Sequence, residues 1–450
     1  MMGYTLPVEI QLTCIPLVIA AYVLYLNGQK AASDNVQNRE FLTFQKVYFL
    51  PYFMALFSDW LQGPYVYKLY SYYGFPQREI AILYVVGFAA SVTFGTATGP
   101  LADKFGRKKM SVIFCLVYAF CCLTKLSSSF NILLIGRILG GISTSILFSV
   151  FESWYVHQHT ITWKYPIDWM SLTFSKATFF NGLLAIIAGI VAQAGSDWLA
   201  FGPVAPFMIA VPFLIIGALL IVKNWEENYG ERTMNWAGSC SEGLSTIMKN
   251  SNILSLGLVQ SLFESNMYIF VFLWTPVLDE GHPPLGLTFS SFMLAIMIGS
   301  SIYSILLNRG ERPEQILQYC LIVMGSSFLV CAISTNPGFP SDYMYLSYLA
   351  FITLEISVGL YFPCIGRLRG ETIPDNLRAN IMNWFRVPMN VITCGGLIGM
   401  HHFDHPQASQ MMFLLCGLSS IVGYLIARAF AKMPKQTTGE EDILKTENNV

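Results

Sequence analysis

A length of 450 residues, of which 54% are hydrophobic and only 12% charged, excludes an ordinary soluble domain, in which about a quarter of the residues carry charge. The formal net charge of −1 argues against a nucleic-acid partner. Windows of about 20 apolar residues, the length that crosses a bilayer as a helix, recur along the whole chain. We therefore predict an all-α polytopic membrane protein, because the alternating segments of about ten residues that a transmembrane barrel needs are absent.

The apolar windows predict thirteen membrane-spanning helices. They lie at about residues 7–26, 46–70, 78–100, 110–126, 130–155, 170–195, 201–223, 252–279, 287–308, 314–333, 343–366, 377–400 and 408–432. The first window has no basic segment before it and contains Glu9, so we expect a retained helix rather than a cleaved signal peptide.

The longest polar gap, residues 224–250, separates seven of these spans from the other six. The segment after the last span has little apolar content and is expected to be disordered. The resulting organisation is an extra N-terminal helix with its loop at 1–45, a six-helix bundle at 46–223, a cytosolic linker at 224–250, a second six-helix bundle at 251–432 and a cytosolic tail at 433–450.

Lysine and arginine are distributed unevenly between the two sides of the membrane. When the loops alternate along the chain, 21 of the 26 basic residues fall on the side of the linker and the C-terminus. The positive-inside rule makes this side cytosolic, and it places the N-terminus outside the cell. Lys68, Arg78 and Lys125 fall on the opposite side, and Arg137 and Arg386 lie inside helices.

The loop after the third span reads GPLADKFGRKK and lies on the basic side. Its glycines allow a tight turn, and a carboxylate beside a basic cluster can form ion pairs that hold two bundles together. The loop resembles the signature loop of the major facilitator superfamily, which implies two bundles around a central substrate site and a gating role for the loop. The matching positions are Gly99, Asp103, Lys104, Gly106, Arg107 and Lys108.

Four acidic residues interrupt the apolar windows, each on the first helix of a three-helix unit: Asp59, Glu152, Glu264 and Glu355. A charge at the bilayer centre costs about 2.5–3.5 kcal/mol, so each is a candidate functional residue. The resemblance implies that these helices line the central cavity. We assign proton coupling to Asp59, Glu264 and Glu355. Glu152 lies near the cytosolic end, where it could pair with Arg107 of the signature loop, and is assigned to gating. Structural ion pairing is the alternative for each acid.

Two arginines inside helices could bind an oxyanion, because a guanidinium group offers paired donors at the spacing of tetrahedral oxygens. Gly63 and Pro64 are expected to bend or unwind the helix just beyond Asp59, which would free backbone groups for a substrate. The candidate substrate-binding residues are Arg386, Arg137, Asp59, Gln62, Tyr65 and Asn383, with Asn390 and Ser145 as further neutral donors. An equally open interpretation is that both arginines only neutralise the acids.

Longer strings carry a closer resemblance: DWLQGPYVYKLY, CCLTKLS, GPVAPF, LFESNMYIFVFLWTPVLD, GLYFPC and NWFRVP. Together they resemble the eukaryotic molybdate-anion transporter family of the major facilitator superfamily, in blocks from about Phe44 to Pro388. The resemblance implies uptake of molybdate across the cell membrane for synthesis of the molybdenum cofactor. The residues themselves do not select molybdate over sulfate or phosphate.

We therefore expect a multi-pass secondary active transporter of the cell membrane and not an enzyme, since the sequence has no G-x-S-x-G, H-E-x-x-H or phosphate-binding loop. No cofactor or metal is expected. The expected partners are molybdate or a related oxyanion, protons as the coupling ion and the lipid bilayer, and the protein is expected to be a monomer. Two alternatives stay open: a carrier of another solute, such as sulfate, a sugar or an organic ion, and a substrate sensor that binds without transport.

Overall fold

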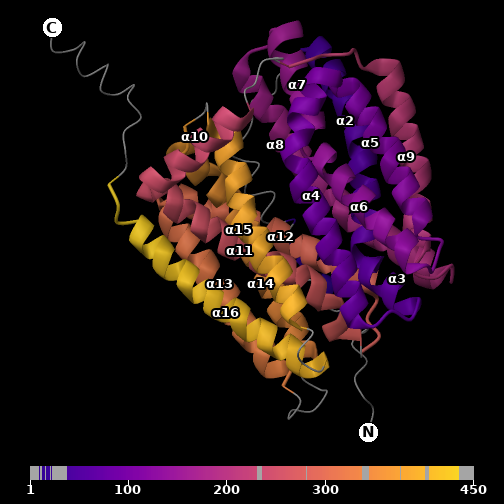
Figure 1. Cartoon of the computed structure of the whole chain (residues 1–450), viewed down its shortest axis with the longest axis vertical. Helices are drawn as coiled ribbons and strands as arrows, with labels where there is room; N and C mark the ends of the chain where they lie inside the picture. The colour runs from indigo at the N-terminus through magenta and orange to yellow at the C-terminus, as the bar shows by residue number, and fades with distance from the viewer. Residues whose placement is uncertain are drawn as a thin grey trace.

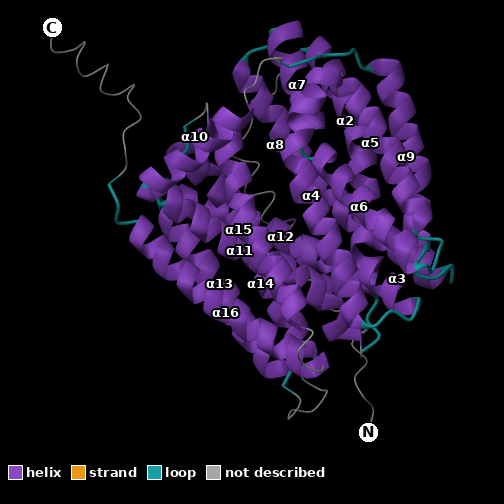
Figure 2. Ribbon diagram, viewed as in Figure 1, coloured by secondary structure: helices purple, strands orange, loops and turns teal. Residues whose placement is uncertain are grey.

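The computed structural model describes residues 38–230, 236–279, 281–336, 344–374, 377–400 and 405–434, together with nine residues between positions 10 and 22. Regular structure within these residues is helical throughout, as Figure 2 shows. Most of the expected N-terminal segment and of the expected tail, and part of the linker, lie outside the described residues.

The helices of the first half of the chain include one short 3-10 turn, Gly63–Tyr65, and two π-helical turns, Gln158–Thr162 and Ala194–Trp198. The α-helices are α2 (Arg39–Gln62), α3 (Val66–Tyr72), α4 (Gln77–Phe105), α5 (Arg107–Thr124), α6 (Phe130–Leu147), α7 (Val150–His157), α8 (Ile167–Gln193) and α9 (Ala205–Asn224). Those of the second half are α10 (Trp236–Lys249), α11 (Ser251–Asp279), α12 (Leu285–Asn308), α13 (Pro313–Ser334), α14 (Met344–Thr372), α15 (Arg378–Gly399) and α16 (His405–Phe430).

The two halves form two groups of helices that lie side by side (Figure 1). Helices α8 and α12 pack together across the boundary, and so do α4 and α15. The groups diverge toward the end where α7 and α10 lie, and they meet toward the end where α3 lies (Figure 1). We call the first end the latch face, because the loop between α4 and α5 lies there, and the second end the closed face.

Nine helical stretches of the described residues are long and apolar enough to cross a membrane. Helices α2, α5 and α15, which cover three of the other predicted spans, are not among them. Each of these three contains at least two charged residues.

Several predicted helix boundaries differ from the observed ones for local reasons. Helix α2 begins at Arg39, seven residues earlier than predicted, because the Asn38 side chain caps it by accepting hydrogen bonds from the backbone N–H groups of Glu40 and Phe41 at 2.9 and 3.1 Å. The predicted helix at 130–155 is interrupted between α6 and α7. The expected break at Gly63 is present as the 3-10 turn Gly63–Tyr65. A proline does not always break a helix in this protein, since α15 continues through Pro388.

The described residues of the N-terminal window are helical and pack against the second half of the chain. Ile10 is fully buried, and the Thr13 hydroxyl forms a hydrogen bond of 3.0 Å with the Tyr348 hydroxyl of α14. Leu17 packs against Leu294 and Ile298 of α12. This window is therefore attached to the second group of helices.

Helices α12 and α14 pack with their backbones in close contact. A Cβ atom at Gly299 would lie 2.1 Å from the carbonyl oxygen of Ile356, and a Cβ atom at Gly359 would lie 2.1 Å from that of Ile296. Both distances are shorter than any van der Waals contact, so only glycine fits at either position.

We predict that Gly359→Ala destabilises the protein by about 1–3 kcal/mol, because the added methyl group must push α12 and α14 apart. Gly366→Ala in the same helix is the matched control, since a Cβ atom there meets open space and alanine favours a helix by up to about 1 kcal/mol. Thermal unfolding of the two purified variants is the measurement. Equal melting temperatures would show that this contact does not stabilise the fold.

Candidate functional site

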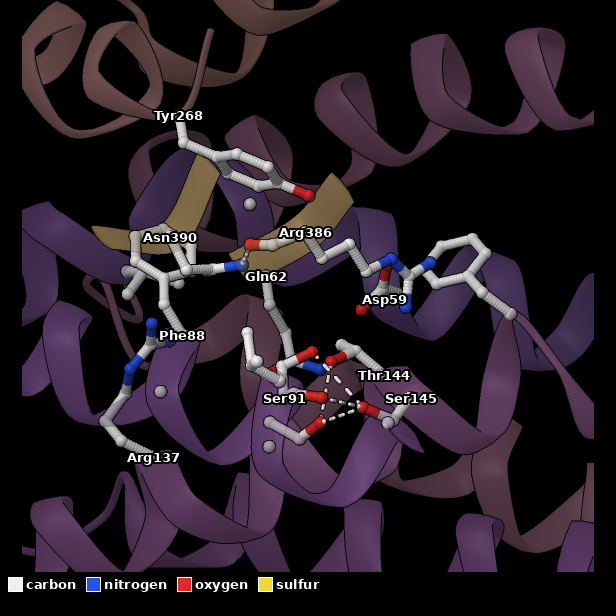
Figure 3. A pocket seen from close by; sticks show the side chains of 18 of the residues that line it. Asp59, Gln62, Phe88, Ser91, Arg137, Thr144, Ser145, Tyr268, Arg386 and Asn390 are labelled. Atoms are coloured by element: carbon white, nitrogen blue, oxygen red, sulfur yellow. Dashed lines mark hydrogen bonds between the residues drawn. The ribbon is translucent and has the colours of Figure 1, made fainter. Parts of the chain in front are cut away.

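A cavity of about 620 Å³ lies between the two groups of helices. Its walls come from α2, α4, α5 and α6 in the first half and from α11, α14 and α15 in the second half. Figure 3 shows polar and charged side chains from both halves pointing into it. The three helices that are too polar to pass as membrane spans, α2, α5 and α15, all contribute to this lining.

The cavity lining contains more positive than negative charge. The charged side chains are the four basic groups of Lys125, Arg137, Arg369 and Arg386 and the two acidic groups of Asp59 and Glu264. Within the described residues, none of the six takes part in an ion pair with a nitrogen-to-oxygen distance of 4.0 Å or less. The lining therefore has an excess of basic over acidic side chains, which is the charge balance that suits an anion.

Arg137 on α6 is held in place by two glycines. A Cβ atom at Gly141 would lie 2.4 Å from the carbonyl oxygen of Gly87, so α6 and α4 approach closely at this level. The Arg137 Nε then donates a hydrogen bond of 3.1 Å to the carbonyl oxygen of Leu83, and its guanidinium lies 4.8 Å from the ring centroid of Tyr84. The guanidinium is thus fixed by neutral groups and keeps its charge available to the cavity.

Arg386 on α15 enters the cavity from the second half and is exposed there. Its Nη1 lies 3.7 Å from the place that a Cβ atom at Gly95 of α4 would occupy, so it reaches the first half. Glu264 on α11 interacts electrostatically with both Arg369 and Arg386, and it accepts a hydrogen bond of 3.1 Å from the Tyr361 hydroxyl. The second half therefore supplies two guanidinium groups that share one carboxylate.

The first half supplies a carboxylate and several neutral groups. Asp59 accepts a hydrogen bond of 2.5 Å from the Tyr118 hydroxyl of α5. Gln62, one turn further along α2, donates to the carbonyl oxygen of Ser58 at 3.0 Å. The hydroxyls of Ser91 and Ser145 lie 3.2 Å apart on facing sides of α4 and α6 (Figure 3). Hydroxyls and an amide are thus available to hydrogen-bond a polar ligand.

Three of the residues proposed for substrate binding or proton coupling do not line the cavity: Tyr65, Asn383 and Glu355. Tyr65 is 1% exposed and donates to the Gln193 side-chain oxygen at 3.2 Å. Glu355 is 5% exposed and forms no hydrogen bond or ion pair with the residues that the structure describes. It is buried within the second group of helices and lies away from the other acids.

The signature loop makes its contacts within the first half of the chain. Arg107 donates to Asp103 at 2.7 and 3.0 Å and to the carbonyl oxygen of Ser153 at 3.1 Å. Glu152 is exposed, and in the described parts of the chain it does not pair with Arg107. Gly106 has a φ of +105°, a conformation that favours glycine. A Cβ atom at Gly99 would meet open space, and the Lys104 Nζ lies 5.6 Å from the ring centroid of Phe105.

The same loop binds the segment that follows α9. The Glu227 carboxylate accepts hydrogen bonds from the backbone N–H groups of Lys108 and Lys109 at 2.8 and 3.2 Å, which caps the N-terminus of α5. The N–H of Arg107 donates to the carbonyl oxygen of Asn228 at 3.0 Å, and the N–H of Gly230 donates to that of Asp103 at 3.3 Å. The start of the linker is therefore part of the first half.

Contacts at the closed face join the two halves directly. Lys68, on α3, forms an ion pair with Asp279, at the end of α11. The Gln193 side-chain oxygen, which accepts from Tyr65, also accepts from the backbone N–H of Gly286 at 2.8 Å. Tyr65 therefore belongs to the closure of this face.

Sequence reasoning missed several polar residues of the lining, among them Lys125, Gln260, Tyr268 and Arg369. The count of basic residues placed Lys125, at the end of the predicted span 110–126, on the outer side, and it placed Arg369, beyond the predicted end at 366, on the inner side. Helix α14 continues to Thr372 and so carries Arg369 into the cavity wall. No group of three or more metal-binding side chains lies together in the part of the chain that the structure covers.

Comparison with known proteins identifies the family. The model of a family described as sugar transporters with 12 transmembrane segments matches residues 12–355. A molybdate-anion transporter of Xenopus tropicalis is 42% identical over 396 residues, which cover 88% of this chain and 87% of that protein. One from Danio rerio is 41% identical over 462 residues, covering 95% and 94%. The chain belongs to the molybdate-anion transporter family of the major facilitator superfamily. It is a multi-pass membrane transporter and not an enzyme, as the sequence predicted.

Solved structures of other transporters share the fold. The nucleoside transporter NupG superposes with a TM-score of 0.64 at 14% identity, covering 87% of this chain and 99% of that one. A mutant of the peptide transporter POT in complex with sulfate superposes with a TM-score of 0.66 at 16% identity, covering 86% and 94%. These likenesses confirm the predicted all-α fold of this family member.

We predict that Gly87→Ala lowers transport by displacing Arg137, because a Cβ atom at Gly87 would lie 2.7 Å from the Arg137 Nη2. Loss of the hydrogen bond from a charged group costs about 1.5–3 kcal/mol, which corresponds to roughly a tenfold loss of affinity or more. Uptake of molybdate, the anion in the names of the relatives, is the measurement, with Gly366→Ala as control. Uptake equal to that of the wild type would show that transport does not depend on the position of the Arg137 guanidinium.

Proposed function

We propose that the protein carries molybdate across the cell membrane by alternating access of one central cavity to the two sides. The observation that carries this proposal is the excess of basic side chains around a cavity formed by both halves. The relatives named as molybdate-anion transporters, which align over most of the chain, support the same substrate.

The charges of the lining match a divalent oxyanion. Four basic groups and two acidic groups leave an excess of two positive charges when all six are ionised. Molybdate is a divalent tetrahedral anion at neutral pH, so its binding would neutralise the cavity. Sulfate has the same shape and charge, and the discrimination between the two depends on size and hydration.

The substrate-binding set that we propose consists of candidate residues that line the cavity, together with Ser91, which the sequence did not single out. Arg386 and Arg137 would hold the anion from the second and the first half respectively, with paired guanidinium donors. Gln62 and the hydroxyls of Ser91 and Ser145 would supply neutral hydrogen bonds. When protonated, Asp59 would face the anion directly. When ionised, it would instead position neighbouring side chains such as Tyr118, whose hydroxyl donates to it.

The structure corresponds to the state in which the latch face is open, because the contacts that join the halves gather at the closed face. The excess of Lys and Arg in the loops of the latch face supports a cytosolic location of this face, with the C-terminus on the same side. Opening of the other side would require separation of Lys68 from Asp279 and of Gln193 from Gly286. We propose a monomeric carrier in which the signature loop takes part in gating.

A sugar or another organic solute is the second candidate substrate. The description of the matching family model favours it, and so do the aromatic side chains of Trp60, Phe88 and Tyr268 in the lining. Aromatic faces pack well against the apolar faces of such solutes. The positive excess of the lining favours the anion over a neutral solute.

Proton coupling is the proposed source of energy, with Asp59 and Glu264 as the proton acceptors. Both carboxylates line the cavity and lack an ion pair of 4.0 Å or less among the described residues, so neither must break such a pair to take up a proton. Taking up a proton would change the charge that the anion meets. Glu355 does not reach the cavity, so we do not include it in this role.

We expect Arg386→Gln to reduce molybdate uptake at least about tenfold, because it removes a charged pair of donors worth about 1.5–3 kcal/mol from the cavity. The measurement is molybdenum accumulation by elemental analysis in cells that lack their own uptake and that express equal amounts of each variant. Arg367→Gln is the matched control, because Arg367 lies on α14 outside the cavity and pairs with Glu371.

Three outcomes separate the candidate functions. Uptake that is lost in Arg386→Gln and blocked by excess sulfate supports the oxyanion site. Uptake that is blocked by sugars supports the second candidate. Wild-type protein that binds molybdate in purified form but accumulates none in cells would overturn the proposal of transport and indicate a sensor.

We expect wild-type uptake to increase when the external medium is acidified, and Asp59→Asn to lose this dependence because the amide cannot take up a proton. Uptake into proteoliposomes with an imposed pH gradient is the measurement. Glu371→Gln, which changes an acid outside the cavity, is expected to keep the wild-type response. Wild-type uptake that ignores the gradient would exclude coupling to protons.

A further inference from the structure

Lys125 is a buried cation next to the cavity. It follows directly after α5, its side chain lines the cavity, and the residue is only 2% exposed. Its Nζ donates a hydrogen bond of 2.8 Å to the Tyr70 hydroxyl and lies 5.1 Å from the centroid of the same ring. Among the residues covered by the structure, no carboxylate pairs with it.

A buried ammonium group with only neutral partners is in an unfavourable environment. The hydroxyl and the ring of Tyr70 attract the charge, but they do not neutralise it. Because the group stands at a cavity wall, an anion that enters the cavity can supply the missing negative charge. An uncharged polar side chain could also form the hydrogen bond to Tyr70, so this contact alone does not require a charge at position 125.

A second cation lies in the same part of the cavity. Lys125 and Arg137 both interact electrostatically with the Cys121 thiol of α5, which also lines the cavity. The Lys125 Nζ lies 3.4 Å from the place that a Cβ atom at Gly136 would occupy, directly before Arg137 in the chain. Asp59 also interacts with the Cys121 thiol, but its hydrogen bond goes to Tyr118.

Lys125 lies at the end of the cavity that faces the closed face. Helix α5 begins at the signature loop on the latch face, and Lys125 follows its other end. The Tyr73 hydroxyl, just after α3, donates a hydrogen bond of 2.5 Å to the Lys125 carbonyl oxygen. Helix α3 also carries Lys68, whose ion pair with Asp279 closes this face. Lys125 therefore stands between the cavity and its closure.

We infer that Lys125, together with Arg137, forms a second anion subsite, which a divalent tetrahedral oxyanion occupies on arrival from the closed face once that face has opened. The anion then stays at Arg137 and exchanges Lys125 for Arg386, which completes the pair of guanidinium groups of the proposed binding site. This inference rests on the proposed transport of an oxyanion, and it assigns the first contact of the anion to a residue outside the candidate set. The subsite acts on anions that enter from the closed face. An anion that enters from the latch face reaches the cavity without passing Lys125.

The test compares uptake and efflux of molybdate in oriented proteoliposomes for the wild type, Lys125→Met and Lys125→Arg. We expect Lys125→Met to raise the KM for transport from the closed face about tenfold or more and to leave the KM from the latch face within about twofold. Lys125→Arg keeps the charge and is expected to stay near the wild type in both directions. Lys176→Met is the control, because Lys176 is exposed and lies outside the cavity.

The outcomes distinguish this inference from the proposed function. Absence of molybdate transport by the wild type would overturn both. If the wild type transports molybdate, an unchanged KM from the closed face in Lys125→Met would overturn the subsite alone, and so would an equal increase of the KM from both faces. If Lys125→Met does not reach the membrane, Lys125→Gln, which keeps a polar contact to Tyr70, is measured in the same way and judged by the same criteria.

Discussion

A charged side chain is stable inside a membrane only where water, an opposite charge or a bound ion takes the place of lipid, and the packing of the helices follows from this constraint. Helices α2, α5 and α15 carry polar side chains and turn them toward the cavity between the halves. Helices α13 and α16, which contribute nothing to the cavity, are among the apolar stretches that suit contact with lipid. Helices α4, α6, α11 and α14 combine the two properties: they are among the apolar stretches, and each turns part of its surface toward the cavity.

The signature loop shows that a motif can be recognised from sequence while its partners remain hidden. Its basic and acidic residues suggested contacts between two bundles. In this state of the protein, Asp103 and Arg107 pair with each other and hold the segment around Glu227 and Asn228. The partners could not be predicted, because they come from a polar segment after α9 that has no regular structure and no pattern of its own.

Hydropathy was sufficient for the helical class and for most of the spans, because a bilayer imposes length and apolarity on every helix that crosses it. It was not sufficient for the cavity, since the face of a helix on which a residue lies depends on tertiary packing. Glu264 and Glu355 occupy comparable places in their spans, yet only Glu264 lines the cavity. Arg369 resembled a loop residue because the predicted span ended at 366, six residues before the end of α14. Lys125 lay at the end of its predicted span, where hydropathy does not show whether a basic side chain turns to the outer side or to the cavity.

The attachment of the linker has a mechanical consequence. Gly230 is hydrogen-bonded to Asp103 of the first half, whereas α10, which begins at Trp236, packs against α11 and α15 of the second half. A stretch of six residues can extend to at most about 20 Å, at roughly 3.3–3.6 Å per residue. The linker therefore acts as a tether that sets an upper limit on the separation of these two points, and hence on the width of the latch face in every state in which both attachments persist.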